Sequence, residues 1–380
     1  MDKVGESEDR QQKAKEYARQ RRWLMAAQVL LGLAYVLALI FGGLSVRLRG
    51  ALALSLPQPM LLLAGLFLVI YLGYEILSLP LSIYSSYVLP HRYGLSVQSL
   101  SSWLADAGKG LGLSVLFGLV GVQVLYWLMA ALPVWWWLVA GLLALGFEVL
   151  LTVVAPVLLM PLFYTLRPLQ DSDLAGRLER MAAGAGARVR GVYVIEFSRK
   201  TTAANAALVG LGGTRRIVLG DTLLDSFARP EIEVVFAHEL GHHVHGDIRR
   251  LLVIRAALML VSLYLVSLLL PMLGPLLGLG GLADPGTLPL LALVLGGFGL
   301  VTMPLANGFS RLLEKAADEY ALRVTDDPQS FRSAMSRLAS QNLAEQDPAG
   351  WVVFLLYSHP PVRERIRHAD EYAGRRISGP

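Results

Sequence analysis

Six long apolar stretches constrain this chain more than any other feature of its sequence. A helix needs about 20 apolar residues to cross the core of a bilayer. Within lipid the backbone must satisfy its own hydrogen bonds, which favours helices. The pattern therefore predicts a mainly α-helical, polytopic membrane protein. The stretches cover residues 23–46, 60–79, 111–132, 134–159, 256–273 and 288–305.

The composition supports this interpretation and narrows the kinds of site. Charged residues make up only 17% of the 380 residues, whereas about 25% is typical of soluble proteins. The chain has no cysteine, so any metal must be held by histidines and carboxylates. The net charge is +5 and the basic residues flank the apolar runs. This arrangement favours membrane anchoring, and we expect no nucleic-acid partner.

The positions of lysine and arginine predict the orientation, because basic residues gather in cytoplasmic loops. Residues 1–22 hold seven of them and residues 160–250 are rich in arginine, whereas residues 274–287 have none. We therefore expect the N-terminus and residues 160–250 in the cytoplasm. Residues 1–22 are expected to be a solvated or surface-lying tail. The arginine-rich, cysteine-free composition favours the cytoplasmic membrane of a bacterium.

Turn residues and periodicity divide the chain into five expected parts. These are a cytoplasmic tail 1–22, a four-span membrane domain 23–159, a cytoplasmic α/β part 160–250, a two-span hairpin 251–307 and a C-terminal part 308–380. The α/β part is expected to contain strands at 189–197, 203–210 and 216–219, a turn at Gly212-Gly213, and helices at 173–184, from 221 and at 231–250. The last helix should run on into the fifth span. The apolar run 351–357 is too short to span and should pack beneath the site.

The motif His238-Glu239-Leu240-Gly241-His242 is the strongest chemical signal. Histidines four residues apart on a helix project from one face, so both rings can bind one Zn²⁺ at about 2.0–2.1 Å. Glu239 then lies beside the metal as a candidate general base. The alternative is an ordinary solvated helix. Four of the seven histidines fall within 238–245, which weighs against that alternative.

A third metal ligand should come from a segment that the fold returns to the same place. The fifth and sixth spans form a hairpin, and Glu314 and Asp318 follow it on one face of the next helix. We expect Glu314 to be the third ligand and Asp318 to accept the second ring N–H of a ligand histidine. The alternative for Glu314 is that it is an ordinary exposed residue of the helix. Glu319 is a weaker candidate, because it points about 100° away from Asp318.

These residues suggest peptide hydrolysis with one Zn²⁺ per chain. The metal would lower the pKa of its bound water towards about 7, and Glu239 would accept the proton as this water attacks a carbonyl. The developing oxyanion needs a hydrogen-bonding or positive partner. His359 and Arg365 are the candidates, although a lone histidine is often structural.

The chain resembles the integral-membrane zinc proteases of the type I CAAX prenyl endopeptidase family. The resemblance rests on four spaced motifs: 238–242, Ser310-Arg311 to Glu314 with Asp318, His359-Pro360-Pro361 with Arg365, and Asn205-Ala206 with Gly210 before 215–224. Residues 79–84 and 91–94 also resemble the N-terminal membrane domain of the family.

The resemblance implies a fold and a set of roles. His238, His242 and Glu314 would be the zinc ligands, Glu239 the base, and His359 and Arg365 stabilisers of the transition state. Asn205, Ala206 and Gly210 would belong to an edge strand that pairs with the substrate backbone. The membrane helices would enclose a chamber, with a gluzincin-like α/β domain at one end. Eukaryotic members have seven spans and the sequence predicts six here, so either one span is missing near the N-terminus or residues 71–90 continue as a broken extra element.

We therefore expect a membrane-embedded zinc endopeptidase that acts at the cytoplasmic face as a monomer. Its partners would be the bilayer and a peptide or protein substrate. Two substrate classes stay open, namely prenylated CAAX-like tails and membrane or misfolded proteins. The alternative is an inactive scaffold that keeps the fold, but the intact motif argues against it. Glu148, inside a span, should face a cavity or a partner, and His243 should lie at the surface.

Overall fold

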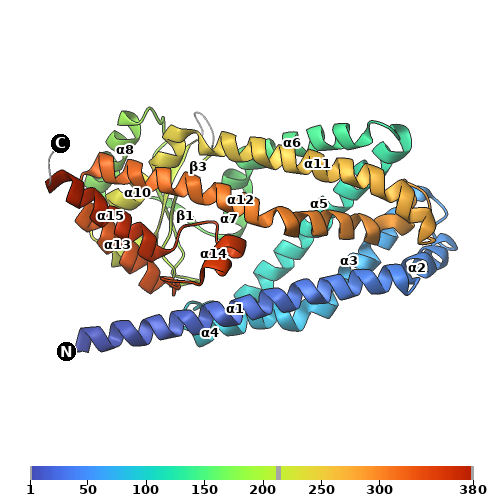
Figure 1. The fold of residues 1–380 in the computed structure, drawn as a ribbon, viewed down its shortest axis with the longest axis horizontal. Coiled ribbons are helices and arrows are strands. Elements are labelled where there is room, and N and C mark those ends of the chain that lie inside the picture. Colours follow the sequence, from blue (N-terminus) through green and yellow to red (C-terminus); the bar gives the residue numbers. More distant parts are fainter. Residues whose placement is uncertain (1, 211–214, 378–380) are drawn as a thin grey trace.

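The computed structural model describes residues 2–210 and 215–377 (Figure 1). Six of the described helices are long and apolar enough to cross a membrane. This agrees with the six spans predicted from the sequence. Most of them extend along the long axis of the molecule, while the small sheet and the C-terminal helices gather at one end (Figure 1). The six candidate spans are Asp9–Phe41, Pro59–Arg92, Leu100–Ala131, Trp136–Phe163, Asp247–Leu276 and Pro285–Thr325.

The N-terminal membrane domain contains four of these spans. Residues 71–90 do not form a seventh span, because they continue the second one through Pro80 and a π-helical turn at Tyr84–Val88. A proline inside a helix removes a backbone hydrogen bond and bends the helix, which explains the broken pattern in the sequence. The helices are α1 (Asp2–Phe41), α2 (Leu44–Ala53), α3 (Pro59–Ile83), α4 (Leu89–Arg92), α5 (Leu100–Ala131), α6 (Trp136–Val154) and α7 (Met160–Phe163).

The start of α1 is docked onto the rest of the protein, which corrects the expectation of a solvated tail. Ala14 and Tyr17 are buried in a small apolar cluster with Leu89, Leu95 and Leu343. The polar side of the helix is also held, because Arg22 Nη1 lies 2.6 Å from the carboxylate of Glu345. The helix therefore has an apolar part long enough to span the membrane and an N-terminal part that packs against the end of the molecule that carries the sheet. A sequence pattern gives no sign of such long-range docking, since the partner residues lie far from this segment along the chain, and two of them, Leu343 and Glu345, lie more than 300 positions away.

The sheet has four short strands in the order β1-β2-β4-β3. Strand β2 pairs in parallel with β4, and the two outer strands pair antiparallel to their neighbours. Three strands fall where the sequence predicted them; β1 was missed because it is three residues long and ends in proline. The predicted turn at 212–213 lies outside the described residues. The strands are β1 (Leu166–Pro168), β2 (Val192–Ile195), β3 (Ala206–Val209) and β4 (Arg216–Gly220).

The helix that carries the histidines ends at His245, so the predicted continuous helix 231–250 was wrong. Gly246 adopts a left-handed backbone with φ +68, which ends one helix and starts the next in a new direction. The remaining helices are α8 (Ser172–Gly184), α9 (Asp221–Ser226), α10 (Arg229–His245), α11 (Asp247–Leu276), α12 (Leu288–Thr325), α13 (Pro328–Gln341), α14 (Gly350–Leu356) and α15 (Val362–Ile377).

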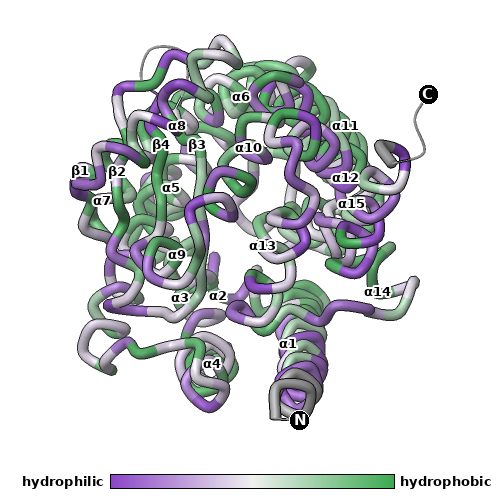
Figure 2. Tube along the Cα trace, turned by 90° about the vertical axis from the view of Figure 1, so that its left-hand side faces the viewer, coloured by the Kyte–Doolittle hydropathy of each residue, from purple (hydrophilic) through white to green (hydrophobic). Residues whose placement is uncertain are grey.

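The protein has two main apolar cores. One lies at the end of the molecule that carries the sheet, where α8, α10, α12, α13 and α15 pack around the strands. The other lies at the far end of the membrane bundle. Viewed along the long axis, α1 and α4 occupy one side and α6 and α11 the opposite side (Figure 2). Helix α10 lies against both α12 and β3, which places the histidines between the sheet and a membrane helix.

The short helix α14 is attached to α12 but is not buried beneath the site as expected. Arg311 Nη1 donates to two backbone carbonyls at the end of α14, and Asn307 Nδ2 donates to the carbonyl of Leu355. Trp351 and Phe354, however, are 65% and 56% exposed. Two apolar side chains of α14, Trp351 and Phe354, therefore face outward, whereas Val352 is buried against the protein.

Candidate metal centre

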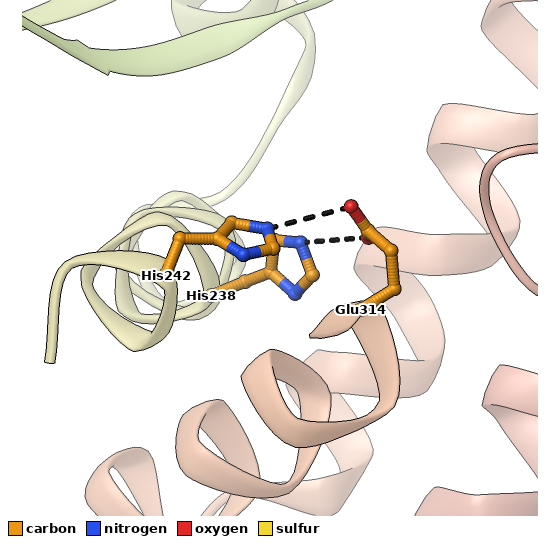
Figure 3. A group of neighbouring side chains, drawn as sticks. All are labelled: His238, His242 and Glu314. Carbon is orange, nitrogen blue, oxygen red and sulfur yellow. Dashed lines mark ion pairs between the residues drawn. The ribbon is translucent and has the colours of Figure 1, made fainter. Parts of the chain in front are cut away.

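Three side chains from two helices meet in one place (Figure 3). His238 and His242 project from α10, and Glu314 projects from α12. Their candidate ligand atoms all lie within 4.8 Å of one another. His238 Nε2 is 3.2 Å and His242 Nε2 is 3.4 Å from the two carboxylate oxygens of Glu314. The structure therefore brings together the three ligands expected from the sequence.

Local sequence explains why α10 presents its histidines to α12. Pro230 stands in the first turn of α10, and the Glu231 carboxylate accepts the backbone N–H of Ala228 at 2.7 Å, which caps the helix start. Gly241 permits a close crossing with α12: a Cβ at this position would lie 2.9 Å from Ala317 Cα. The two helices can therefore approach closely enough for Glu314 to reach both histidines.

His238 has a rigid support behind it. Its Nδ1 lies 2.9 Å from Asp318 Oδ1, as expected for a carboxylate that orients a ligand histidine. Arg365 holds Asp318 with two hydrogen bonds, from Nε at 2.8 Å and from Nη2 at 2.5 Å. Asp318 is 1% exposed, so this bidentate pair lies inside the protein, where such bonds are strong. The support fixes the ring of His238.

His242 is supported by a second carboxylate, which was not predicted from the sequence. Asp247 Oδ2 lies 2.9 Å from His242 Nδ1, and Asp247 is 2% exposed. Asp247 is the first residue of α11, and the break at Gly246 turns it back towards His242. An aspartate just beyond a glycine and five positions after a ligand histidine was a usable signal. It was overlooked because one continuous helix was expected there.

The two supports make the group suitable for a metal. Since the Nδ1 atom of each histidine faces an aspartate, that nitrogen is the one that carries the proton when the ring is neutral. The lone pairs of the two Nε2 atoms then point at Glu314. Two imidazoles and one carboxylate form a usual ligand set for catalytic zinc, and this set leaves a position for water.

Charge around the pair shifts the pKa of both histidines in the metal-free protein. Burial lowers the pKa of His238, but hydrogen bonds to Asp318 and Glu314 outweigh burial and raise it to about 9. For His242, burial also lowers the pKa, and the hydrogen bonds to Glu314 and Asp247 raise it above its usual value. The surrounding carboxylates thus favour a cation between them, whether protons or a metal ion.

Glu239 is placed as a base would be. It follows His238 on α10 and is half-buried. Among the described residues it forms no hydrogen bond or ion pair, so its carboxylate is available to a water molecule beside the metal position. The negative charge of Glu239 also acts on Arg365. Burial lowers the pKa of Arg365, but Asp318 and the nearby glutamates outweigh burial and raise this pKa above its usual value.

The two residues expected to stabilise the transition state lie in different places. His359, in the loop between α14 and α15, reaches the metal group, with Nδ1 2.8 Å from Glu314 Oε2 and a side chain that is 61% exposed. Arg365 lies behind His238, with Nη2 3.3 Å from His238 Nδ1 and a side chain that is 13% exposed. Arg365 thus contacts Asp318 and His238, and its role in stabilising the transition state stays a prediction.

The residues expected to bind the substrate backbone lie on and beside β3. This strand pairs only with β4 among the described strands, so its other edge is open. Asn205 precedes it, Ala206 begins it and Gly210 follows it with φ +89. Asn342 holds the approach to the strand, since its side chain accepts from Ala204 N and donates to Ala204 O.

Three further residues singled out in the sequence lie outside the metal group. Glu319 pairs with His368 at 2.8 Å and so points away from the metal group. Glu148 in α6 faces a partner, as expected, with Oε1 3.1 Å from Arg255 in α11. His243 is partly buried; burial and two nearby arginines lower its pKa.

Comparison with known proteins places these features in context. Residues 168–373 match peptidase family M48, and residues 5–165 match the N-terminal domain of CAAX prenyl proteases, described as five membrane helices. Here four described helices of that region are long enough to span, and α2 is a short fifth element.

Two relatives match over nearly the full chain. Metalloprotease YhfN of Bacillus subtilis is 30% identical over 94% of this chain and 85% of its own length. The "Probable CAAX prenyl protease 1" of Schizosaccharomyces pombe is 26% identical over 96% and 80%. The crystal structure of S. mikatae Ste24p superposes with a TM-score of 0.83 at 23% identity, covering 95% of this chain and 89% of that one. These likenesses confirm the predicted fold, a membrane helix chamber with a small α/β part.

Proposed function

Because the chain belongs to peptidase family M48 and is a membrane metalloendopeptidase of the CAAX prenyl protease family, we propose that its metal is one Zn²⁺ held by His238, His242 and Glu314. Zinc is favoured over harder cations such as Mg²⁺ and Ca²⁺ because two of the three ligands are imidazoles. The observation that carries the proposal is the convergence of both Nε2 atoms and the Glu314 carboxylate within 4.8 Å.

The side chains around this group divide the work of hydrolysis. Zinc, when bound, would polarise the scissile carbonyl and acidify a water molecule. The Glu239 carboxylate accepts a proton from the attacking water and passes it to the amine that leaves. His359 stands at the exposed side of the group and donates a hydrogen bond to the carbonyl oxygen as negative charge develops. Arg365 acts through Asp318 and keeps His238 in place.

Strand β3 is the proposed substrate-binding element. Its free edge offers backbone N–H and C=O groups to an extended peptide, and Asn205, Ala206 and Gly210 mark the stretch. Because β3 lies against α10, a peptide added to this edge runs beside the metal group. Binding of this kind uses hydrogen bonds to the peptide backbone, so peptides with many different side chains can bind.

The proposed setting is the cytoplasmic side of a bacterial membrane. The basic N-terminal part of α1, the α/β part and the C-terminal helices lie at one end of the bundle (Figure 1), and the positive-inside rule places that end in the cytoplasm. A monomer suffices, since all the site residues come from one chain. We also propose that the chain divides into the five parts predicted from its sequence, namely 1–22, 23–159, 160–250, 251–307 and 308–380.

The test of the chemistry is Glu239→Gln in the full-length protein. We expect the variant to bind one zinc per chain, measured by elemental analysis, and to lose at least about 100-fold in the rate of peptide cleavage. Glu233→Gln, which removes an acid on the same helix that pairs with Arg177, is the control and should cleave normally. Normal cleavage by Glu239→Gln would refute the mechanism, and an inactive wild-type protein that holds zinc would favour the scaffold alternative.

The substrate class needs a separate measurement. Relatives are named CAAX prenyl proteases, whereas recognition through a strand edge requires no lipid on the peptide. We propose peptide segments of membrane or misfolded proteins as substrates and expect similar cleavage of a farnesylated peptide and its unmodified twin. A strong preference for the farnesylated peptide would assign prenylated tails instead.

A further inference from the structure

A groove with two arginines lies outside the metal centre, between the start of α11 and α12. It offers about 480 Å³ and is lined by Arg249, Arg250, Val253, Ile254 and Phe309, with His245 and Gly246 at its end. Phe309 precedes Glu314 by five residues on α12, which turns the two side chains about 140° apart. The groove is thus on the outer side of α12, away from the metal. We call it the arginine groove.

The groove lies where the lipid-facing surface of α11 begins. One side of α11 carries an exposed apolar stripe that includes Val253, Val261, Leu268 and Met272, which are between 49% and 69% exposed. The spacing of these residues follows the helical repeat. A wall of a water-filled cavity would include polar groups along such a stripe, whereas lipid chains match it. Val253 is the first residue of the stripe and also lines the groove.

Two positive charges stand one turn before this stripe. Arg249 and Arg250 are exposed and precede Val253 by four and three positions, so they share its face of the helix. The Arg249 guanidinium lies beside Gly246, where α10 ends and α11 begins. A Cβ on Gly246 would be 3.1 Å from Arg249 Nη2. This height, at the end of the apolar stripe, is the level of lipid headgroups.

The charge of the pair is only partly compensated. Arg250 Nη1 lies 3.6 Å from Asp247 Oδ1, and the side chain of Arg250 is still 55% exposed. Arg249 forms no ion pair with a carboxylate among the described residues. Among the described residues, Asp247 is the carboxylate that forms an ion pair with this arginine pair, and its other oxygen lies 2.9 Å from His242 Nδ1. The groove therefore presents net positive charge beside an apolar floor.

We propose that the arginine groove binds an anionic phospholipid. The phosphate lies between Arg249 and Arg250, where guanidinium groups can hold its oxygens with paired hydrogen bonds. The first methylenes of an acyl chain lie on Val253, Ile254 and Phe309. A zwitterionic lipid offers the same acyl contact but carries a compensating positive charge, so it binds more weakly. The site lies outside the catalytic group and does not depend on the proposed hydrolysis.

The test measures lipid binding to the full-length protein in detergent by native mass spectrometry. Phosphatidylglycerol and phosphatidylcholine with identical acyl chains are the probes. We expect wild-type protein to prefer phosphatidylglycerol, and the double variant Arg249→Gln/Arg250→Gln to lose about 5-fold in affinity per arginine, from about 1 kcal/mol per basic residue near an anionic lipid. Phe309→Ala should weaken both lipids alike.

The matched control is Arg332→Gln/Arg367→Gln, which removes two exposed arginines of α13 and α15 and should leave the lipid preference unchanged. Thermal unfolding of each variant shows that it is folded. The proposal is overturned if wild-type protein binds both lipids equally, or if the groove variant keeps the preference of the control. It is also overturned if millimolar inorganic phosphate displaces the lipid completely, because the site would then read free phosphate.

Discussion

The two histidines proposed as metal ligands occupy one helix but are supported by different helices of the molecule. His238 is held from the catalytic core: Asp318 orients it, Arg365 clamps Asp318, and the side chain of His238 is 9% exposed. His242 is held from the start of α11, because Asp247 is the first residue of that helix, and the side chain of His242 is 24% exposed. In the described part of the chain no arginine holds Asp247 with two hydrogen bonds; its second oxygen lies 3.6 Å from Arg250 Nη1.

Because of this difference, the positions of the two histidines depend on two different parts of the fold. The position of His238 depends on packing between α10, α12 and α15. The position of His242 depends on the bend at Gly246 and on where α11 sits in the membrane. We infer that a change in the bend between α10 and α11 reaches the metal group through His242 first, whereas a shift of α12 acts through His238 and Glu314. Four predictions test this asymmetry, ordered from the largest expected effect to the smallest.

Arg365→Ala should have the largest effect. It leaves the buried carboxylate of Asp318 without its cationic partner, and breaking a buried pair costs about 3–5 kcal/mol. The unfolding temperature of metal-free protein should fall sharply, as measured by intrinsic fluorescence. Arg363→Ala, which removes an exposed arginine paired with Asp347, is the control and should unfold normally. Equal unfolding of the two variants would show that the clamp does not stabilise the core.

Removal of the two aspartates should weaken zinc binding unequally. Loss of a carboxylate that orients a ligand histidine usually costs about 10–100-fold in metal affinity. Asp318→Ala should lie at the upper end, because it also leaves Arg365 buried without a partner, and Asp247→Ala at the lower end. Zinc affinity is measured by competition with a chelator. Asp247→Asn, which keeps an acceptor, should recover most of the loss; no recovery would mean that Asp247 acts otherwise than by holding His242.

Gly241→Ala tests the close crossing that both halves share. The new Cβ would meet the backbone of Ala317 at 2.9 Å, and forced separation of packed helices costs about 1–3 kcal/mol. Both the unfolding temperature and the zinc affinity should fall. Gly184→Ala on α8 has open space around the added Cβ and serves as the control. If both variants behave like wild type, the crossing is less restrictive than its geometry indicates.

Zinc affinity should depend on pH through His238 more than through His242. Hydrogen bonds raise the pKa of His238 to about 9 in the metal-free protein, so this ring holds a proton below that pH and zinc must displace it. Apparent zinc affinity should therefore fall by up to about 10-fold for each pH unit below 9. Chelator competition between pH 6 and 9 measures the slope. Asp318→Asn should flatten it more than Asp247→Asn, and equal slopes in both variants would remove the distinction.

Much of the fold was readable from the sequence, since its signals are local. Apolar runs long enough for a bilayer gave six spans, and the helical repeat put His238 and His242 on one face. Alternation of β-forming residues gave three of the four strands. The errors also had local causes, since one glycine, Gly246, ends a helix that periodicity alone would continue, and a three-residue strand carries too little pattern to notice.

The sequence by itself determined the chemistry available: two histidines and a glutamate beside them on a helix, a carboxylate pair after a two-span hairpin, and no thiol. Only the tertiary structure decided how these groups are held. It brought Glu314 to both Nε2 atoms, turned Arg365 behind His238, assigned Asp247 to His242 and docked the start of α1 on the catalytic end. Such contacts join residues that are distant in sequence, and their geometry depends on how whole helices pack, which no periodicity records.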